Sequence, residues 1–331
     1  MRYLLFILPI FLSLSLCSQE TLPALAGRLT QGKKNELEKV TAIFKWITHN
    51  ISYRTKNGYR FLDKNRQKSE IIPEAEGDPI KPLNLLVAET VLKRREAVCD
   101  GYSRLFATLC ELAGIRSEVI VGYARTGSNK PVKGFGVNHY WNAVMIEGKW
   151  HLLDATWASG YLSRQGDVFI RDFDEKYFLA EPEEFIKDHF PDDPRWTLLP
   201  DSKIPDEFRY SPFRHRAYNK YNFVSYTPST GIINAYIGDT ISLNLEAAIP
   251  DGRSISPSEL TDTSLYNYSS AWVFLRPDIE RVVPHLPLKC SYTYTVSSPA
   301  IQWLYLLYND DVVLRYKINV KNRETGSTAS L

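Results

Sequence analysis

The chain has 331 residues, a length that exceeds one typical domain and favours two. Hydrophobic residues make up 44% and charged residues 24% of the chain, the balance of a folded globular protein. The formal net charge of +2, without a dominant basic run, argues against nucleic acid as a main partner.

Residues 1–18 have the layout of a secretory signal. Arg2 precedes an unbroken apolar run over 3–12, and small and polar residues follow it. A membrane-spanning helix needs about 20 apolar residues, more than this run contains. We therefore expect cleavage near Ser18 and a chain exported to the periplasm, the cell surface or the medium. Lipid attachment and membrane anchoring at Cys17 is the alternative, although Leu16 is larger than such sites favour.

Residues 19–204 are predicted to form one domain of helices and strands. Apolar residues at helical spacing predict a helix over 35–51, and charge and proline predict a long irregular segment over 54–82. A short helix is expected at 85–95, and the clearest helical stripe runs over 102–113. The later elements of this domain are predicted as follows: a strand at 117–124, two strands over 138–157 joined at Glu147-Gly148, and a helix from Pro182 that stops before Pro191.

The character of the chain changes after residue 204. Residues 205–222 are rich in aromatic and charged residues without a clear period, which predicts a linker packed on a surface. Short β-prone runs separated by turn residues fill 223–321 and predict an antiparallel, immunoglobulin-like β-sandwich. Residues 322–331 are expected to be a disordered tail.

The placement of Cys99 distinguishes it from an ordinary cysteine. Most cysteines are small buried hydrophobic residues, and that is the first interpretation for any of them. Cys99-Asp100-Gly101, however, lies directly before the clearest helical stripe. Unpaired backbone N–H groups and the helix dipole favour a thiolate at such a position. Asp100 opposes this effect unless it serves as the N-cap.

The predicted hairpin brings an imidazole and a carboxylate together. If Glu147-Gly148 forms a two-residue turn, Trp141 pairs with Asp154, and His139 lies one diagonal step from Asp154 on the same face. A carboxylate beside a histidine fixes its tautomer and stabilises the imidazolium. A bulge would shift this register. A cysteine at a helix start, a histidine on a strand and an aspartate on the next strand form the arrangement that a cysteine nucleophile requires.

These residues resemble a known family. VCDGYSRLFATLCELAGI followed by NHYWNAVMIEGKWHLLDATWASGY resembles the transglutaminase-like superfamily, and more closely its kyphoscoliosis-peptidase branch. KYFLAEPEEFIKDHFPDDPRWTLL resembles the segment that follows the core in that branch. The resemblance implies an α+β, papain-like core, in which a helix with the nucleophilic cysteine packs on an antiparallel sheet. It also implies that Cys99 is the nucleophile, His139 the general base and acid, and Asp154 the residue that orients His139.

The activity implied by the resemblance is acyl transfer on amides through a thioester, with no cofactor. Hydrolysis of protein or cell-wall peptides by a peptidase or amidase is the favoured outcome. Asp100 and Gly101 replace the tryptophan-containing run of the animal crosslinking enzymes, and no calcium-ligand cluster is evident, so protein crosslinking is a weaker alternative. A non-catalytic peptide-binding or scaffolding protein with the same fold is the alternative from another functional class.

The other candidate residues have structural interpretations. Trp141 and Trp157 flank the hairpin site and are predicted to line a substrate groove, with core aromatics as the equal alternative. No metal is expected at Cys99, His139 and Asp154, because the close ligand pairs of zinc sites are absent around them. Residues predicted to be structural are Cys110 and Cys290 in the core, His151 on the opposite hairpin face, and His189 and His215 at the surface or in packing.

Overall fold

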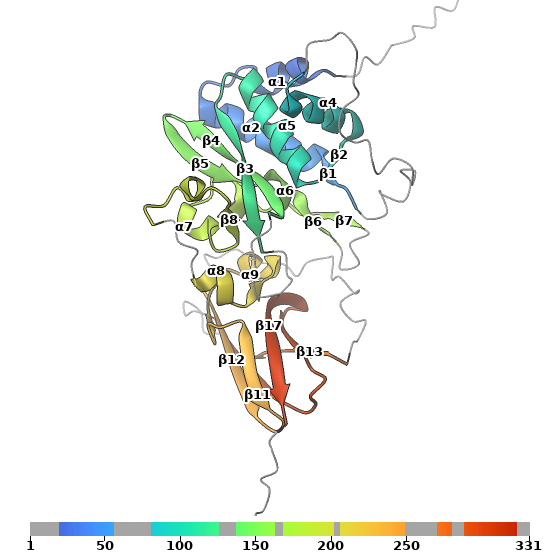
Figure 1. The fold of residues 1–331 in the computed structure, drawn as a ribbon, viewed down its shortest axis with the longest axis vertical. Helices are drawn as coiled ribbons and strands as arrows, with labels where there is room; N and C mark the ends of the chain where they lie inside the picture. The colour runs from blue at the N-terminus through green and yellow to red at the C-terminus, as the bar shows by residue number, and fades with distance from the viewer. Residues whose placement is uncertain are drawn as a thin grey trace, which may run out of the picture.

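The computed structural model describes residues 20–55, 81–125, 137–162, 168–201, 206–248, 270–279 and 288–322. The predicted leader with Cys17 lies outside the described residues, as do most of the irregular segment over 54–82 and nearly all of the predicted tail. Figure 1 shows a core of helices and one sheet, followed by a region made mainly of β-strands. Among the helices of the described ranges, none is long and apolar enough to cross a membrane.

The longer helices of the core gather around α5 (Figure 1). They are α1 (Leu22–Thr30), α2 (Glu36–Asn50), α4 (Leu83–Arg94) and α5 (Cys99–Leu112). The predictions of helices at 35–51, 85–95 and 102–113 are confirmed by α2, α4 and α5, although α5 already begins at Cys99. Helix α1 was not predicted, although Thr21 caps it and a proline lies in its first turn.

Helix α5 is the centre of the core because most of its apolar stripe is buried, although Leu112 at its end is exposed. Its fully buried side chains are Tyr102, Leu105, Phe106, Leu109 and Cys110. Polar contacts fix the helix against its neighbours: the Tyr102 hydroxyl donates to the Ile51 carbonyl at 2.8 Å, and the Asn142 amide donates to the Ser103 carbonyl at 3.0 Å. The start of α5 is therefore held at a defined place relative to the sheet.

The core sheet has the strand order β5-β4-β3-β8, and all its pairs are antiparallel. Its strands are β3 (Ser117–Ala124), β4 (His139–Ile146), β5 (Lys149–Leu153) and β8 (His189–Pro191). Helix α5 packs on β4 and β3. The two short strands β1 (Ser52–Tyr53) and β2 (Glu96–Ala97) form a separate parallel pair, next to the start of α5. The predicted α+β core with a helix on an antiparallel sheet is confirmed.

The β4–β5 hairpin keeps the predicted turn but ends earlier than expected. Ile146 pairs with Lys149, as the two-residue turn requires, and the ladder continues to the pair Asn142–Leu153. The predicted strand through Thr156 is wrong, because Asp154 leaves the strand and caps the short helix α6 (Ala155–Ser159). Capping satisfies the N–H groups of that helix, which a further strand residue would leave unpaired.

The helix predicted from Pro182 is also shorter than expected. It begins at Pro182 but ends at Phe185 as α7, and the chain then pairs with β3 as strand β8. Ala124 pairs with His189 and Gly122 with Pro191. The edge of β3 offers backbone hydrogen bonds to this segment. These bonds outweigh the local preference of the segment for a helix. Two further short strands, β6 (Gly160–Leu162) and β7 (Phe169–Arg171), form a hairpin beside α6.

Gly122 is the position where β3, β4 and β8 approach most closely. A Cβ atom there would overlap the Phe190 carbonyl oxygen and would lie 2.5 Å from Cη2 of Trp141 and 2.7 Å from Cα of Pro191. We expect Gly122→Ala to lower the free energy of unfolding by about 1–3 kcal/mol, because the obstructing atoms include backbone that cannot rotate away. Urea unfolding measures this. Gly27→Ala in α1, where a Cβ meets nothing within 4 Å, is the control and should unfold no earlier than the wild type.

The C-terminal region forms two sheets that share one apolar core. One sheet has the order β10-β12-β15-β14 and the other β11-β17-β16-β13, and buried side chains from both meet between them. The strands are β10 (Phe223–Thr227), β11 (Ile232–Tyr236), β12 (Thr240–Ala247), β13 (Trp272–Leu275), β14 (Asp278–Ile279), β15 (Lys289–Thr295), β16 (Trp303–Tyr308) and β17 (Asp311–Lys321). The prediction that the strands are antiparallel is wrong for two pairs, because β11 pairs parallel with β17 and β13 pairs parallel with β16. The immunoglobulin-like assignment of this region stays a prediction.

The segment predicted as a linker, 205–222, contains regular structure. Its elements are α8 (Asp206–Tyr210), β9 (Phe213–Arg214) and α9 (Arg216–Lys220). Strand β9 pairs antiparallel with β17, so the segment adds to a sheet of the C-terminal region. Figure 1 shows this segment between the core and the two sheets.

Candidate active site

Cys99 is the first residue of α5, and its side chain is partly exposed. Val98 is the N-cap and makes no side-chain capping bond. Asp100 therefore does not cap the helix. It pairs with Arg104 at 2.7 Å, a cation that offsets its charge. The thiol thus lies at the positive end of the helix dipole, where a negative charge is stabilised.

His139 and Asp154 lie in direct contact. Nε2 of His139 is 2.7 Å from Oδ2 of Asp154, and the two residues are 4% and 0% exposed. Cys99 lies near the same imidazole, and its side chain contributes to raising the pKa of His139. Since Asp154 occupies Nε2, the ring nitrogen that remains for Cys99 is Nδ1. The structure therefore brings together the three residues that the sequence analysis selected.

The position of Asp154 is fixed from both sides of its carboxylate. Oδ1 accepts hydrogen bonds from the backbone N–H groups of Thr156 at 2.7 Å and Trp157 at 3.1 Å, which leaves Oδ2 for the histidines. The backbone N–H of Asp154 donates to the Tyr177 carbonyl at 2.9 Å. Helix capping thus orients the carboxylate that contacts His139, a role that the strand model of this segment did not anticipate.

Burial and charge act in opposite directions on this pair. Burial by itself would raise the pKa of Asp154, but the charges and hydrogen bonds of His139 and His189 hold that pKa well below its ordinary value. Burial would lower the pKa of His139, but the charge and hydrogen bond of Asp154 and the side chain of Cys99 raise it. Both shifts favour an ionised carboxylate beside an imidazole that holds a proton readily.

His189 is a second histidine at the same carboxylate. The sequence analysis placed it at the surface or in packing, but it is 1% exposed, and its Nε2 lies 3.1 Å from Oδ2 of Asp154. Its Nδ1 lies 2.9 Å from Oδ1 of Asp188. Strand β8 carries His189 to this point through its pairing with β3. No local spacing in the sequence signals this contact, because 35 residues separate His189 from Asp154.

Asp188 extends the network towards the surface. Its Oδ2 accepts from Lys176 at 3.0 Å and from the Tyr177 hydroxyl at 3.3 Å. Burial would raise the pKa of Asp188, but Lys176, His189 and Arg214 together hold that pKa well below its ordinary value. A continuous row of hydrogen-bonded groups therefore runs from His139 through Asp154, His189 and Asp188 to Lys176.

Aromatic rings enclose the two histidines. Trp141 is 1% exposed and packs on His139 and His189, with ring centroids 6.1 and 5.2 Å away. Trp141 was predicted to line a substrate groove or to be a core aromatic, and its deep burial fits the core aromatic. Trp157 is only partly buried, and its ring centroid lies 5.6 Å from that of His139. It shields the histidine pair from solvent.

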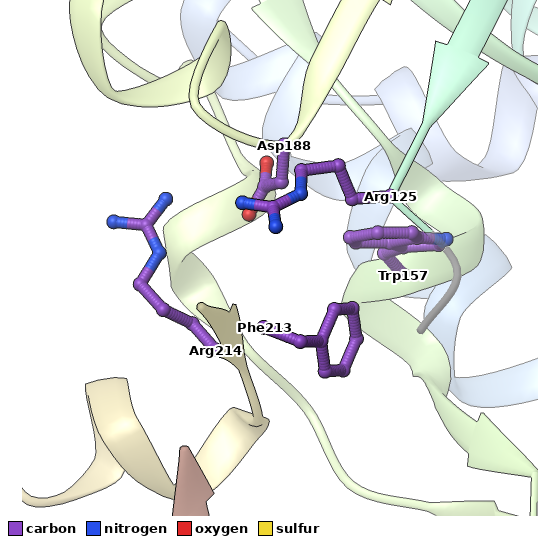
Figure 2. A pocket seen from close by; sticks show the side chains of 5 residues that line it. All are labelled: Arg125, Trp157, Asp188, Phe213 and Arg214. Carbon is purple, nitrogen blue, oxygen red and sulfur yellow. The ribbon is translucent and has the colours of Figure 1, made fainter. Parts of the chain in front are cut away.

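Trp157 also borders a small pocket to which the C-terminal region contributes. Figure 2 shows Trp157 and Phe213 facing the pocket, with the guanidinium of Arg125 close to Asp188. Phe213 and Arg214 come from β9. Arg216 of α9 donates to the Trp157 carbonyl at 2.8 Å. Residues beyond 204 therefore form part of the wall next to His139.

Three side chains at the site have the chemistry of metal ligands. One ligand atom each from His139, Asp154 and His189 lies within 4.8 Å of the others. A tetrahedral zinc ion, with bonds of about 2.0 Å, spaces its ligands roughly 3.3 Å apart. Here both histidines contact the same carboxylate oxygen, at 2.7 and 3.1 Å, and the second nitrogen of His189 is taken by Asp188. The arrangement fits hydrogen bonds better than a shared ion.

The sequence analysis also gave structural interpretations to Cys110, Cys290, His151 and His215. Cys99, Cys110 and Cys290 are free thiols, and burial raises the pKa of Cys110 and raises that of Cys290 to about 11. His151 pairs with Val144, on the hairpin face opposite His139. Burial and the nearby Arg315 lower the pKa of His215 to about 3. The structural interpretations of Cys110 and Cys290 are confirmed by their burial.

Comparison with known proteins finds one family model and several relatives. A model described as the transglutaminase-like superfamily matches residues 23–155. The kyphoscoliosis peptidase of Homo sapiens is 33% identical over 236 residues, which cover 69% of this chain and 32% of that protein. The kyphoscoliosis peptidase of Mus musculus is 31% identical over 228 residues, which cover 68% of this chain and 31% of that protein.

This chain thus spans about a third of the length of these curated relatives. A solved structure described as a TGase is 21% identical and covers 47% of this chain and 34% of that chain, with a TM-score of 0.26.

Proposed function

The domain over residues 23–155 belongs to the transglutaminase-like superfamily, and we propose that it catalyses cysteine-dependent acyl transfer on amide bonds. The observation that carries this proposal is the contact between His139 Nε2 and Asp154 Oδ2 at 2.7 Å, with the side chain of Cys99 near the same imidazole. A nucleophile, a base and an orienting carboxylate in this order are what a cysteine acyl transferase needs.

The proposed reaction uses each group in turn. His139 takes the proton of Cys99 through Nδ1, and the thiolate attacks the carbonyl carbon of the substrate amide. His139 then gives that proton to the leaving nitrogen, and a thioester on Cys99 remains. Water, deprotonated by His139, attacks the thioester and releases a carboxylic acid and the free thiol. The backbone N–H of Cys99, at the start of α5, is a donor for the oxyanion.

Hydrolysis of protein or cell-wall peptides is the outcome we favour over crosslinking. Asp100 and Gly101 follow the nucleophile; Asp100 pairs with Arg104, and close packing around Gly101 leaves no room there for a bulky residue. A Cβ at Gly101 would lie 2.7 Å from that of Ala97. The predicted leader supports substrates outside the cytoplasm. A peptide amide offered together with a primary amine separates the outcomes: free acid supports hydrolysis, and incorporated amine supports crosslinking.

The activation of Cys99 is testable without a known substrate. We expect iodoacetamide at about pH 6, where an ordinary thiol is mostly protonated, to label Cys99 and not Cys110 or Cys290. His139→Ala should slow this labelling by at least about tenfold, because the imidazolium no longer stabilises the thiolate. Peptide mapping by mass spectrometry measures the rate at each cysteine.

His151→Ala, on the opposite face of the same hairpin, is the matched control and should label like the wild type. Equal, slow labelling of Cys99 in the wild type and in His139→Ala would reject the enzyme hypothesis. That result would favour the alternative, a peptide-binding protein that keeps the fold without catalysis.

A further inference from the structure

Two histidines share one oxygen of Asp154, and one of them, His139, lies near the nucleophile. We propose that His189 is a positioning residue that stays protonated on both ring nitrogens and limits how tightly His139 holds its proton. This inference rests on the proposed function, since it assigns His189 a role through His139. It adds a buried cation to a site otherwise made of a thiol, an imidazole and a carboxylate.

The geometry around His189 supports the doubly protonated form. Nε2 faces Asp154 Oδ2 at 3.1 Å, and Nδ1 faces Asp188 Oδ1 at 2.9 Å. An ionised carboxylate only accepts hydrogen bonds, so each nitrogen that faces one must carry a hydrogen. A neutral ring would set a lone pair against one of the two carboxylates. Both contacts are satisfied together only by an imidazolium.

Both carboxylates are held in the ionised form by other groups. Asp154 accepts two backbone N–H bonds at Oδ1, in addition to its contact with His139. Asp188 accepts from Lys176 and from the Tyr177 hydroxyl, and the charge of Arg214 also acts on it. Neither carboxyl group is therefore placed to donate its own proton to His189. The proton must reside on the ring.

Lys176 and Arg214 act on Asp188, and a protonated His189 supplies a positive charge next to Asp154. Asp154 and Asp188 supply two negative charges, Lys176 pairs with Asp188, and His189 pairs with Asp154. The other groups packed on the ring, apart from His139, are aromatic: Phe185 at 4.3 Å, Trp157 at 4.5 Å, Trp141 at 5.2 Å and Tyr177 at 5.7 Å between centroids. They carry no charge at neutral pH, and a neutral His189 would leave a buried carboxylate without its counter-ion.

The cation at His189 acts on His139 through space and through Asp154. Their ring centroids lie 5.4 Å apart, and the charge of His189 lowers the pKa of His139 against the raising effect of Asp154. His189 also occupies part of the hydrogen-bonding capacity of Oδ2. An acid that is to protonate a leaving nitrogen must release its proton readily, and an imidazolium next to Asp154 alone would hold it more tightly.

The protonation state of His189 is measured by NMR of the full-length chain with ¹⁵N-labelled histidine, from pH 5 to 9. We expect both ring nitrogens of His189 to carry hydrogen up to at least pH 8, and His189→Gln identifies the signals by their loss. His215, buried beside Arg315, serves as the neutral reference. A non-protonated nitrogen on His189 at pH 7 would overturn the proposal, whether or not the chain has any activity.

The effect on His139 is measured by the pH dependence of Cys99 alkylation. Gln at position 189 keeps an N–H donor for Asp154 but removes the charge, so we expect the alkaline transition of His139 to move up by about one to two pH units. His151→Gln is the matched control and should keep the wild-type profile. An unchanged profile in a folded His189→Gln protein would reduce His189 to a structural residue and reject the proposal.

Discussion

Replacing Cys99 by alanine is expected to lower the rate of amide hydrolysis by about 10⁴- to 10⁶-fold, to the level that binding and oxyanion stabilisation alone supply. The loss should appear in kcat, because the thiol forms the covalent intermediate and contributes little to substrate binding. Cys99, His139 and Asp154 are expected to act as a unit. A His139→Ala change in addition to Cys99→Ala should therefore lower the rate almost no further. The rate is measured as release of the leaving amine from a peptide amide. The concentration of active sites is taken from the mass of protein in the assay.

The control for this experiment is Cys110→Ala in the same helix. Cys110 is completely buried, and its replacement leaves a small cavity in the core. It should lower thermal stability slightly and leave kcat per folded molecule unchanged. Retention of hydrolysis by Cys99→Ala would contradict the assignment of the nucleophile.

Asp154→Asn is expected to lower kcat by about 10³- to 10⁴-fold. The amide of an asparagine donates to Nε2 of His139, which moves the ring hydrogen to Nδ1, the atom that must accept the proton of Cys99. The loss of the negative charge also lowers the pKa of His139, whose elevation depends on Asp154. The pH above which the imidazolium is lost should therefore fall, the opposite direction from the shift expected for His189→Gln.

The same substitution should reduce stability. Asp154 is 0% exposed and is the partner of His189, and removing one member of a buried ion pair costs about 3–5 kcal/mol. Because the folded-state pKa of Asp154 is depressed, its contribution is present above the ordinary carboxyl pKa and is lost as the pH falls below it. The difference between wild type and variant should thus be largest near neutral pH and shrink in acid.

Asp174→Asn provides the matched control for the substitution. Asp174 also caps a helical turn, accepting from the Lys176 N–H at 3.1 Å, but none of its described hydrogen bonds involves a histidine. It should lose about 1 kcal/mol of stability or less and keep its activity. Equal kcat values for Asp154→Asn and the wild type would show that Asp154 serves only as a helix cap.

The sequence predicted the parts of the site that depend on local spacing. The stripe after Cys99 located the helix start, and the turn at Glu147-Gly148 set the register from Ile146 to Leu153. His139 and Asp154 are 15 residues apart in one hairpin, so their meeting could be anticipated. The local structure at Asp154 could not be anticipated. The strand ends because Asp154 caps α6 through the N–H groups of that helix, and the alternation of a strand does not indicate a cap.

The parts that could not be predicted depend on contacts between distant segments. His189 reaches Asp154 because β8 pairs with the edge of β3, whereas proline and glutamate at 181–184 favoured a longer helix. Trp141 was predicted to flank the site either as a groove residue or as a core aromatic, and α7 and β8 cover it with Phe185 and His189. In both cases the segments that meet lie far apart in the chain, and His189 and Asp154 are separated by 35 residues.

The C-terminal region contacts the wall of the candidate active site, and these contacts limit where domains can be exchanged between this chain and another. Arg125 of the core donates to the Ser211 hydroxyl at 2.5 Å and to its carbonyl at 2.8 Å, and Arg216 holds the backbone at Trp157. Residue 204, where the composition changes, is therefore not a suitable position for joining domains from two different chains. A chimaera joined there would take Cys99, His139 and Asp154 from one parent and the residues that support Trp157 from the other.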